Sequence, residues 1–113
     1  MKNLLVLSLT LFIGLSAFSQ ELKKTEIIKI KTSAVCGMCK KTIETALNEL
    51  GGVKSALLDV PTKVVTVTYK TSKVSAEEIR KAISMVGYDA DDMPADAKAY
   101  ENLHGCCKKD AKH

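Results

Sequence analysis

The sequence predicts a small α+β domain in which two helices cover one face of a four-stranded antiparallel sheet. Three short runs alternate apolar and polar residues, which is typical of half-buried strands. Two other runs repeat apolar residues at helical spacing. Turn signals separate these runs, namely Gly51-Gly52, Pro61-Thr62 and Gly87. The 94 residues after position 19 suffice for one domain with a modest core.

The first two elements are a strand and a helix. Residues 25–32 predict a strand with Ile28 and Ile30 on one face. Residues 40–50 predict an amphipathic helix that the glycines at 51 and 52 end. Its apolar positions follow the i, i+3, i+4, i+7 pattern: Ile43, Ala46, Leu47 and Leu50.

Two further strands and a second helix follow. Residues 53–60 alternate apolar and polar positions, and so do residues 63–70, on either side of a short turn. Ser75 and Glu78 form an S-x-x-E capping box, which predicts a helix start. That helix carries its own apolar stripe: Ile79, Ala82, Ile83 and Val86.

Residues 88–92 predict a short fourth strand, which completes the order β-α-β-β-α-β. This order is the ferredoxin-like pattern. The domain then spans residues 25–92, and residues 93–113 form a C-terminal extension. Residues 95–103 favour a short helix, whereas we expect the polar, lysine-rich residues 105–113 to be mobile.

The first 19 residues have the character of a cleavable signal peptide. Lys2 supplies the positive charge, fifteen residues without a charge follow, and Ala17-Phe18-Ser19 forms a small-x-small cleavage pattern before Gln20. The alternative is a membrane anchor, but a membrane span needs about 20 apolar residues. We therefore expect export to the periplasm or the extracellular space, and a mature protein that does not span a membrane.

The remaining chain carries 16 basic and 13 acidic side chains, a net charge of about +3. The charges are mixed along the chain and Arg80 is the only arginine, so nucleic-acid binding is not indicated. Export would place the four cysteines in an oxidising compartment, where disulfides are common. Cys36 with Cys39, and Cys106 with Cys107, would close almost no loop and would stabilise a fold little.

The motif Cys36-Gly37-Met38-Cys39 lies between the first strand and the first helix. Free backbone N–H groups and the helix dipole at a helix start favour thiolates, and Lys40 and Lys41 add positive charge beside them. Two thiolates suit Cu(I) or Hg(II), whereas Zn(II) prefers four ligands. Both histidines, His104 and His113, lie in the extension. The motif thus predicts a soft-metal site formed by Cys36 and Cys39.

Residues 27–92 resemble the heavy-metal-associated domain, the family of copper chaperones, amino-terminal domains of copper pumps and periplasmic mercury-binding proteins. The resemblance rests on the ordered motifs Cys36-Gly37-Met38-Cys39, Gly52-Val53, Val65-Thr66-Val67-Thr68-Tyr69 and Gly87-Tyr88. It implies that Cys36 and Cys39 are metal ligands and that Tyr88 lies beside the metal loop or at the edge of the core.

The resemblance further implies a non-enzymatic metal carrier that passes its ion on by thiolate exchange. Cu(I) is the expected ion, with Hg(II), Zn(II) or Cd(II) as alternatives. The implied partner is a metal-transporting membrane pump or another metal-binding domain, and the protein is a monomer or a metal-bridged dimer. One departure is notable: the family has Gly-Met where this chain has Ser33-Ala34. Met38 is an exposed methionine or, less simply, a partial substitute.

The extension offers a second pair, Cys106 and Cys107. These thiols are incidental, or they join Cys36 and Cys39 in a four-sulfur site that would admit zinc or cadmium or cap Cu(I), or they bind an ion of their own. An alternative function for the C-x-x-C motif is thiol–disulfide exchange. That chemistry needs a thioredoxin-like strand order and a proline facing the cysteines, and neither Pro61 nor Pro94 is placed for it. A third alternative is a sensory domain whose metal loading depends on redox state.

Overall fold

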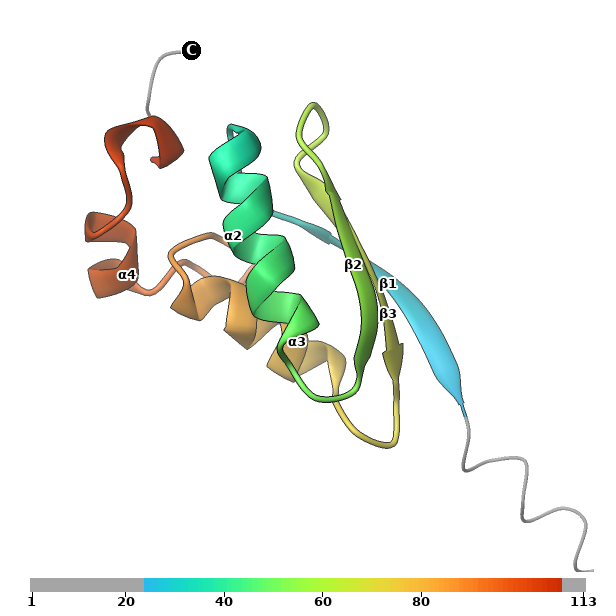
Figure 1. Cartoon of the computed structure of the whole chain (residues 1–113). Coiled ribbons are helices and arrows are strands. Elements are labelled where there is room, and N and C mark those ends of the chain that lie inside the picture. The colour runs from blue at the N-terminus through green and yellow to red at the C-terminus, as the bar shows by residue number, and fades with distance from the viewer. Residues whose placement is uncertain (1–23, 109–113) are drawn as a thin grey trace, which may run out of the picture.

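The structure is a computed structural model, and it describes residues 24–108. The predicted signal peptide and the last five residues lie outside this range. Strands β1 (Thr25–Lys31), β2 (Val53–Asp59) and β3 (Val64–Lys70) form the sheet. Its order is β1-β3-β2, and both pairings are antiparallel (Figure 1). These strands agree with the predicted ones to within one residue at each end.

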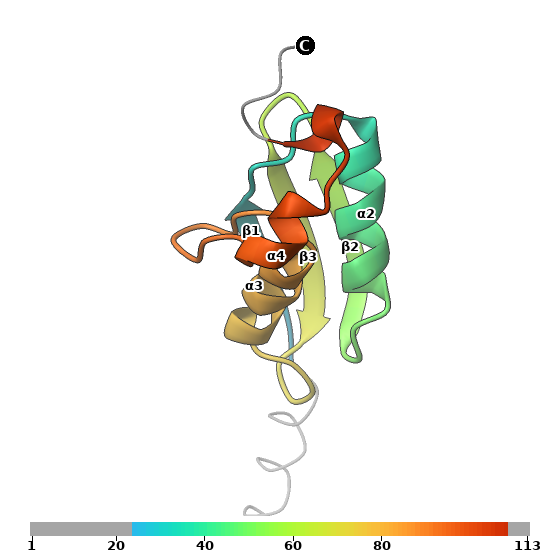
Figure 2. The ribbon, with the colours of Figure 1, turned by 90° about the vertical axis from the view of Figure 1, so that its left-hand side faces the viewer.

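Helices α2 (Gly37–Asn48) and α3 (Ala76–Met85) lie on one face of this sheet (Figures 1 and 2). The predicted apolar stripes face inward, because Ile43, Leu47, Ile79 and Ile83 are fully buried. They pack with the inward-facing side chains of the strands: Ile30, Leu58, Val65, Val67 and Tyr69. The helix–sheet arrangement confirms the predicted α+β class and ferredoxin-like order for these elements.

The capping box at the start of α3 is confirmed. The Glu78 backbone N–H donates to Ser75 Oγ at 3.1 Å, and the Ser75 backbone N–H donates to Glu78 Oε1 at 3.0 Å. These two bonds satisfy donors that a helix start otherwise leaves unpaired.

The predicted fourth strand is wrong, since the described residues hold only three. Ala90 makes isolated bridges to Thr32 and Met93 instead of extending a ladder. The chain reverses at once, because the Ala90 N–H donates to the Met93 carbonyl and Asp91 has a positive φ of 52°. The Asp91 carboxylate then accepts from the Lys31 backbone N–H at 2.9 Å. A side chain thus occupies a β1 donor that a fourth strand would have paired.

The extension folds back along the domain (Figure 2). The expected short helix is α4 (Ala97–Glu101), and a 3₁₀ turn follows at Gly105–Cys107. The expectation of a mobile end is wrong for residues 105–108, because Cys107 is only 2% exposed and belongs to the core. Among the described residues, none of the helices has the length and apolar character that crossing a bilayer requires.

Candidate metal centre

Cys36 and Cys39 meet at the start of α2, as predicted. Cys36 is the N-cap residue and Cys39 lies in the first turn. Their Sγ atoms are 3.3 Å apart, and all four cysteines are free thiols. Cys39 is fully buried whereas Cys36 is partly exposed. One thiol therefore belongs to the core, and the other reaches the surface.

The loop before Cys36 is anchored at two points. The Thr32 backbone N–H and its hydroxyl both donate to the Lys63 carbonyl at 2.8 Å, which ties the loop to the turn between β2 and β3. The Ser33 hydroxyl accepts from the Asp89 N–H at 2.9 Å. Sequence reasoning missed both anchors, because no local pattern indicates which distant backbone groups they reach.

The expected lowering of the thiol pKa holds for Cys36, and of the two expected causes the backbone N–H groups at the helix start contribute, whereas the lysines do not. Partial burial opposes the shift, while the backbone N–H groups of Cys39 and Met38 and the neighbouring thiols lower the pKa. Free N–H groups at a helix start have this effect on a thiolate.

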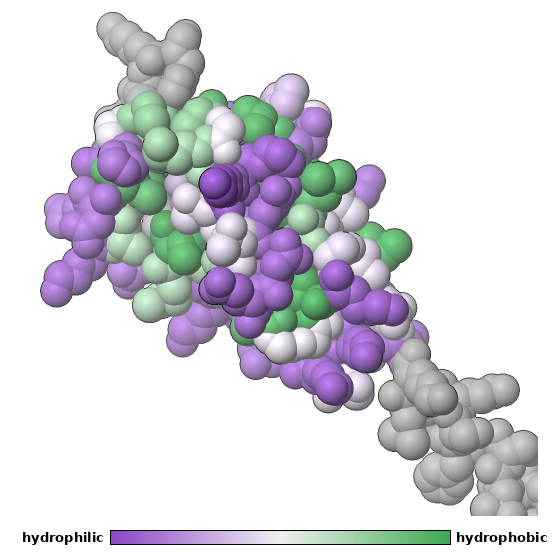
Figure 3. All heavy atoms as spheres, in the orientation of Figure 1, coloured by the Kyte–Doolittle hydropathy of each residue, from purple (hydrophilic) through white to green (hydrophobic). Residues whose placement is uncertain are grey.

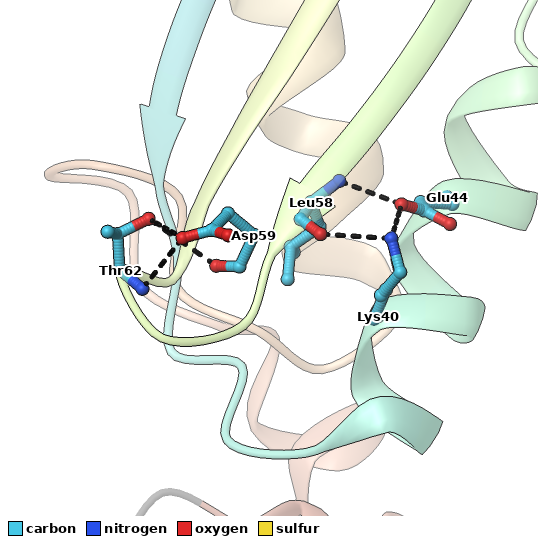
Figure 4. A network of polar contacts seen from close by, with 5 residues as sticks. All are labelled: Lys40, Glu44, Leu58, Asp59 and Thr62. Carbon is cyan, nitrogen blue, oxygen red and sulfur yellow. Dashed lines mark hydrogen bonds and ion pairs between the residues drawn. The ribbon is translucent and has the colours of Figure 1, made fainter.

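Lys40 does not supply the charge that the sequence suggested. Its Nζ atom lies 2.6 Å from Glu44 Oε2 and 3.0 Å from the Leu58 carbonyl. Glu44 also accepts from the Leu58 N–H at 2.7 Å, which links α2 to β2 (Figure 4). In the adjoining turn, Asp59 accepts from the hydroxyl and the N–H of Thr62. Lys40 thus connects the helix to the sheet rather than to the thiols.

The second cysteine pair, Cys106 and Cys107, lies close to the first pair. Cys107 Sγ lies 3.7 Å from Cys36 Sγ and 3.8 Å from Cys106 Sγ. The sulfurs of Cys36, Cys106 and Cys107 all lie within 4.8 Å of one another. Cys39 Sγ is 3.8 Å from the Cys107 carbonyl oxygen. Burial, together with the neighbouring thiols, raises the pKa of Cys107 to about 12. Four sulfurs are therefore clustered at one end of the molecule.

Figure 3 shows weakly hydrophobic atoms gathered at this end, where α2 begins and the extension lies. Met38 is 48% exposed in the first turn of α2, in agreement with the simpler of its two interpretations. Ala34 is fully buried, and its N–H donates to Thr32 Oγ1 at 3.1 Å. The small side chain at position 34 is thus part of the core beneath the site.

Tyr88 lies in the core and is only 1% exposed. Burial, with the nearby sulfurs of Cys39 and Cys107, raises its pKa above the ordinary value of 10. Its hydroxyl has no hydrogen-bond partner within the described part of the chain. The side chain is therefore both a core aromatic and an unused donor beside the thiols, which unites the two roles that the sequence left open.

The model of the heavy-metal-associated domain family matches residues 30–89. The chain belongs to this family. The match covers both anchors of the loop, Cys36, Cys39 and Tyr88, but it stops before the extension. Membership places the chain among metal-binding domains rather than enzymes.

Several proteins are similar to this chain. The copper chaperone CopZ of Staphylococcus aureus is 39% identical over 64 residues, which are 57% of this chain and 93% of that protein. A solved CopZ metallochaperone is 37% identical with a TM-score of 0.54, and the likeness covers 59% of this chain and 98% of that one. The Cu(I)-loaded N-terminal domain of a potential copper-translocating P-type ATPase from Bacillus subtilis is 28% identical, with a TM-score of 0.57 over 60% and 86% of the two chains.

The alternative of thiol–disulfide exchange loses its structural support. It required a thioredoxin-like fold with a proline opposite the cysteines. Pro61 instead lies in the turn between β2 and β3, and the carbonyl of Pro94 accepts from the Ser84 hydroxyl. The fold and the family are those of a metal-binding domain.

Proposed function

We propose that this protein is an exported Cu(I) carrier that binds its ion through Cys36 and Cys39. The observation that carries the proposal is the 3.3 Å approach of the two sulfurs at the start of α2 in a heavy-metal-associated fold. The copper names of its relatives support the choice of ion. Soft thiolate ligands select Cu(I) over harder cations.

The environment suits a small anionic complex. A Cu(I) ion bound by two thiolates carries one negative charge, and the N–H groups at the start of α2 offset it. Residues 25–92 contain no histidine, so this core has no imidazole to complete a zinc site. Hg(II), Zn(II) and Cd(II) are the competing ions.

Transfer would proceed by thiolate exchange with a partner that has similar ligands. Partly exposed Cys36 is the sulfur that an incoming thiolate reaches first, while buried Cys39 keeps hold of the ion. A domain of a metal-transporting membrane pump fits this role, because such a domain shares the fold. In this scheme the carrier acts as a monomer, and a metal-bridged dimer is the competing state.

Native mass spectrometry of the reduced protein, offered Cu(I), Zn(II) and Hg(II) together, tests the proposal. We expect one Cu(I) per chain at the core and loss of this ion in the Cys36→Ser, Cys39→Ser double variant. Met38→Leu is the matched control, since it removes the third sulfur of the motif and should keep binding. Stoichiometric core binding by the double variant, with an unchanged circular dichroism spectrum, would refute the assignment.

Export is tested separately. The full chain, produced in a bacterium with a periplasm, should be recovered from the periplasmic fraction with an N-terminus at Gln20. A cytoplasmic protein that retains its first 19 residues would contradict export while leaving metal binding untouched.

A further inference from the structure

We propose that Cys107, from the C-terminal extension, is a third ligand to the Cu(I) ion that Cys36 and Cys39 hold. The proposal rests on the proposed function and deepens it. It assigns a ligand that lies outside the family match, which ends at residue 89.

The distances from Cys36 Sγ to the sulfurs of Cys39 and Cys107 fit a site with three ligands. With metal–sulfur bonds of about 2.3 Å, a trigonal site separates its sulfurs by about 4.0 Å, whereas a linear site separates them by about 4.6 Å. Cys36 Sγ and Cys107 Sγ, at 3.7 Å, are already close to the trigonal separation. Cys36 Sγ and Cys39 Sγ, at 3.3 Å, have less far to open for a trigonal site than for a linear one.

The extension holds Cys107 in place through bonds to the domain. The Asp96 N–H donates to the Ser84 carbonyl at 2.9 Å, and the Ser84 hydroxyl donates to the Pro94 carbonyl at 2.8 Å. The Cys107 N–H donates to the His104 carbonyl at 2.8 Å, which closes the 3₁₀ turn. Cys107 is thus a buried residue at a defined position rather than a thiol on a free end.

The Tyr88 hydroxyl is an independent sign of a ligand at this position. It is buried beside the sulfurs of Cys39 and Cys107, and within residues 24–108 it donates to nothing. An unpaired buried donor costs free energy, and a metal-bound thiolate is a strong acceptor for it. Three thiolates and one Cu(I) carry a net charge of −2, so a donor on this side of the site complements the N–H groups of α2.

A third internal ligand changes how the ion leaves. The sulfur of a partner thiol would lose its proton and form a bond to copper as the bond from copper to Cys107 Sγ breaks, and copper stays Cu(I) throughout. The released Cys107 thiolate takes up the proton that the incoming thiol gives up. Until that exchange, Cys107 occupies the position that a second copy of this protein would need in order to form a metal-bridged dimer.

X-ray absorption spectroscopy of the reduced protein with one equivalent of Cu(I) tests the assignment. We expect three sulfur neighbours in the wild type, two in Cys107→Ser, and three in Cys106→Ser, which is the adjacent and exposed control. Loss of a ligand should cost at least what loss of an outer-shell partner costs, roughly 10–100-fold in Cu(I) affinity. Competition with a chromophoric chelator measures this affinity, and Cys107→Val serves if the serine variant does not fold.

The outcomes separate the two proposals. Two sulfur neighbours in the wild type, with equal affinity in Cys107→Ser, overturn the third ligand and leave the carrier intact. A third neighbour that disappears in Cys106→Ser but not in Cys107→Ser also overturns it. Failure of the wild type to bind Cu(I) at all overturns the proposed function itself.

Discussion

The two cysteine pairs lie on structural elements of very different length. Cys36 and Cys39 belong to the start of α2, which has 12 residues and is anchored in the core by the fully buried Ile43 and Leu47. Cys106 and Cys107 stand on a 3-residue turn, preceded by the 5-residue α4, which has no buried side chain. The first pair therefore shares the stability of the whole domain, whereas the second depends on docking contacts that open at lower cost.

The largest effect on folding should come from the support of the first pair. Leu47→Ala removes a fully buried side chain of α2 and should lower the free energy of unfolding by about 2–5 kcal/mol. Urea denaturation followed by circular dichroism measures this loss. Leu57→Ala is the control on the outer face of the sheet, where 65% exposure predicts a change within about 0.5 kcal/mol. Equal losses in the two variants would contradict the helix as the main support.

Substitutions at two glycines distinguish strain within the domain from loss of docking by the extension. Gly52 and Gly87 both have φ near +100°, and alanine at either should cost about 1–3 kcal/mol in backbone strain. Only at position 87 would the new Cβ meet the extension, at 3.0 Å from the Ala99 carbonyl oxygen. At position 52 it would meet Lys73 and Val74 instead.

Alkylation of the thiols, read by mass spectrometry, distinguishes these variants. We expect Gly87→Ala to expose Cys107 to rapid modification and Gly52→Ala to leave it protected. Equal protection of Cys107 in both variants would show that the extension docks independently of the contact at Gly87.

Sequence reasoning succeeded where a contact is local and failed where it is distant. The spacing of Ile43 and Leu47 and the spacing of Ser75 and Glu78 each involve only a few neighbouring residues. Sequence spacing alone therefore predicted the helical stripe and the capping box. The prediction of a fourth strand failed because the reversal of the chain there depends on hydrogen bonds between Asp91 and the distant backbone of Lys31. For the site, the meeting of Cys36 and Cys39 followed from helix geometry.

The position of the second pair did not follow from sequence in this way. It depends on bonds that join Ser84 to Pro94 and Asp96, and hydroxyl or carbonyl partners of this kind leave no periodic signal. Lys40 is a similar case, because its neighbours in sequence suggested the thiols while its actual partners lie on α2 and β2.

A smaller effect is expected at the link between α2 and the sheet. The pKa of Glu44 is lowered below its ordinary value of 4.5. Burial acts to raise this pKa, but the hydrogen bonds from Lys40 and from the Leu58 N–H outweigh it. Glu44→Gln should therefore reduce the free energy of unfolding by about 1 kcal/mol near neutral pH. The contribution of the carboxylate is complete above pH 4.5 and is lost as the pH falls through the lowered pKa.

Urea denaturation of wild type and Glu44→Gln, at about pH 7 and about pH 3, measures this difference. We expect the difference in free energy of unfolding between the two proteins to be smaller at the lower pH. Glu77→Gln is the control, because a side chain that is 76% exposed should change stability by less than about 0.5 kcal/mol. A gap that stays constant across this pH range would exclude the carboxylate charge as its source.

The smallest effect on folding is expected at Tyr88, where the two cysteine pairs meet. Tyr88→Phe removes a buried hydroxyl that has no partner in the described chain, so the metal-free protein should change by less than about 0.5 kcal/mol or gain stability. If metal-bound thiolates accept from this hydroxyl, the same variant should bind Cu(I) roughly tenfold more weakly, the value of one hydrogen bond to a charged group.

Tyr69→Phe is the matched control for this experiment. Tyr69 is also a buried tyrosine, but it lies near the end of β3 away from the turn that anchors the metal loop. Its variant should leave Cu(I) affinity unchanged in the same chelator competition. A Tyr88→Phe variant with wild-type affinity and raised stability would mean that the hydroxyl never meets the ion's ligands. In that case Cys107 would lie close to Cys36 and Cys39, but the Tyr88 hydroxyl would donate to none of these sulfurs in the Cu(I)-bound protein.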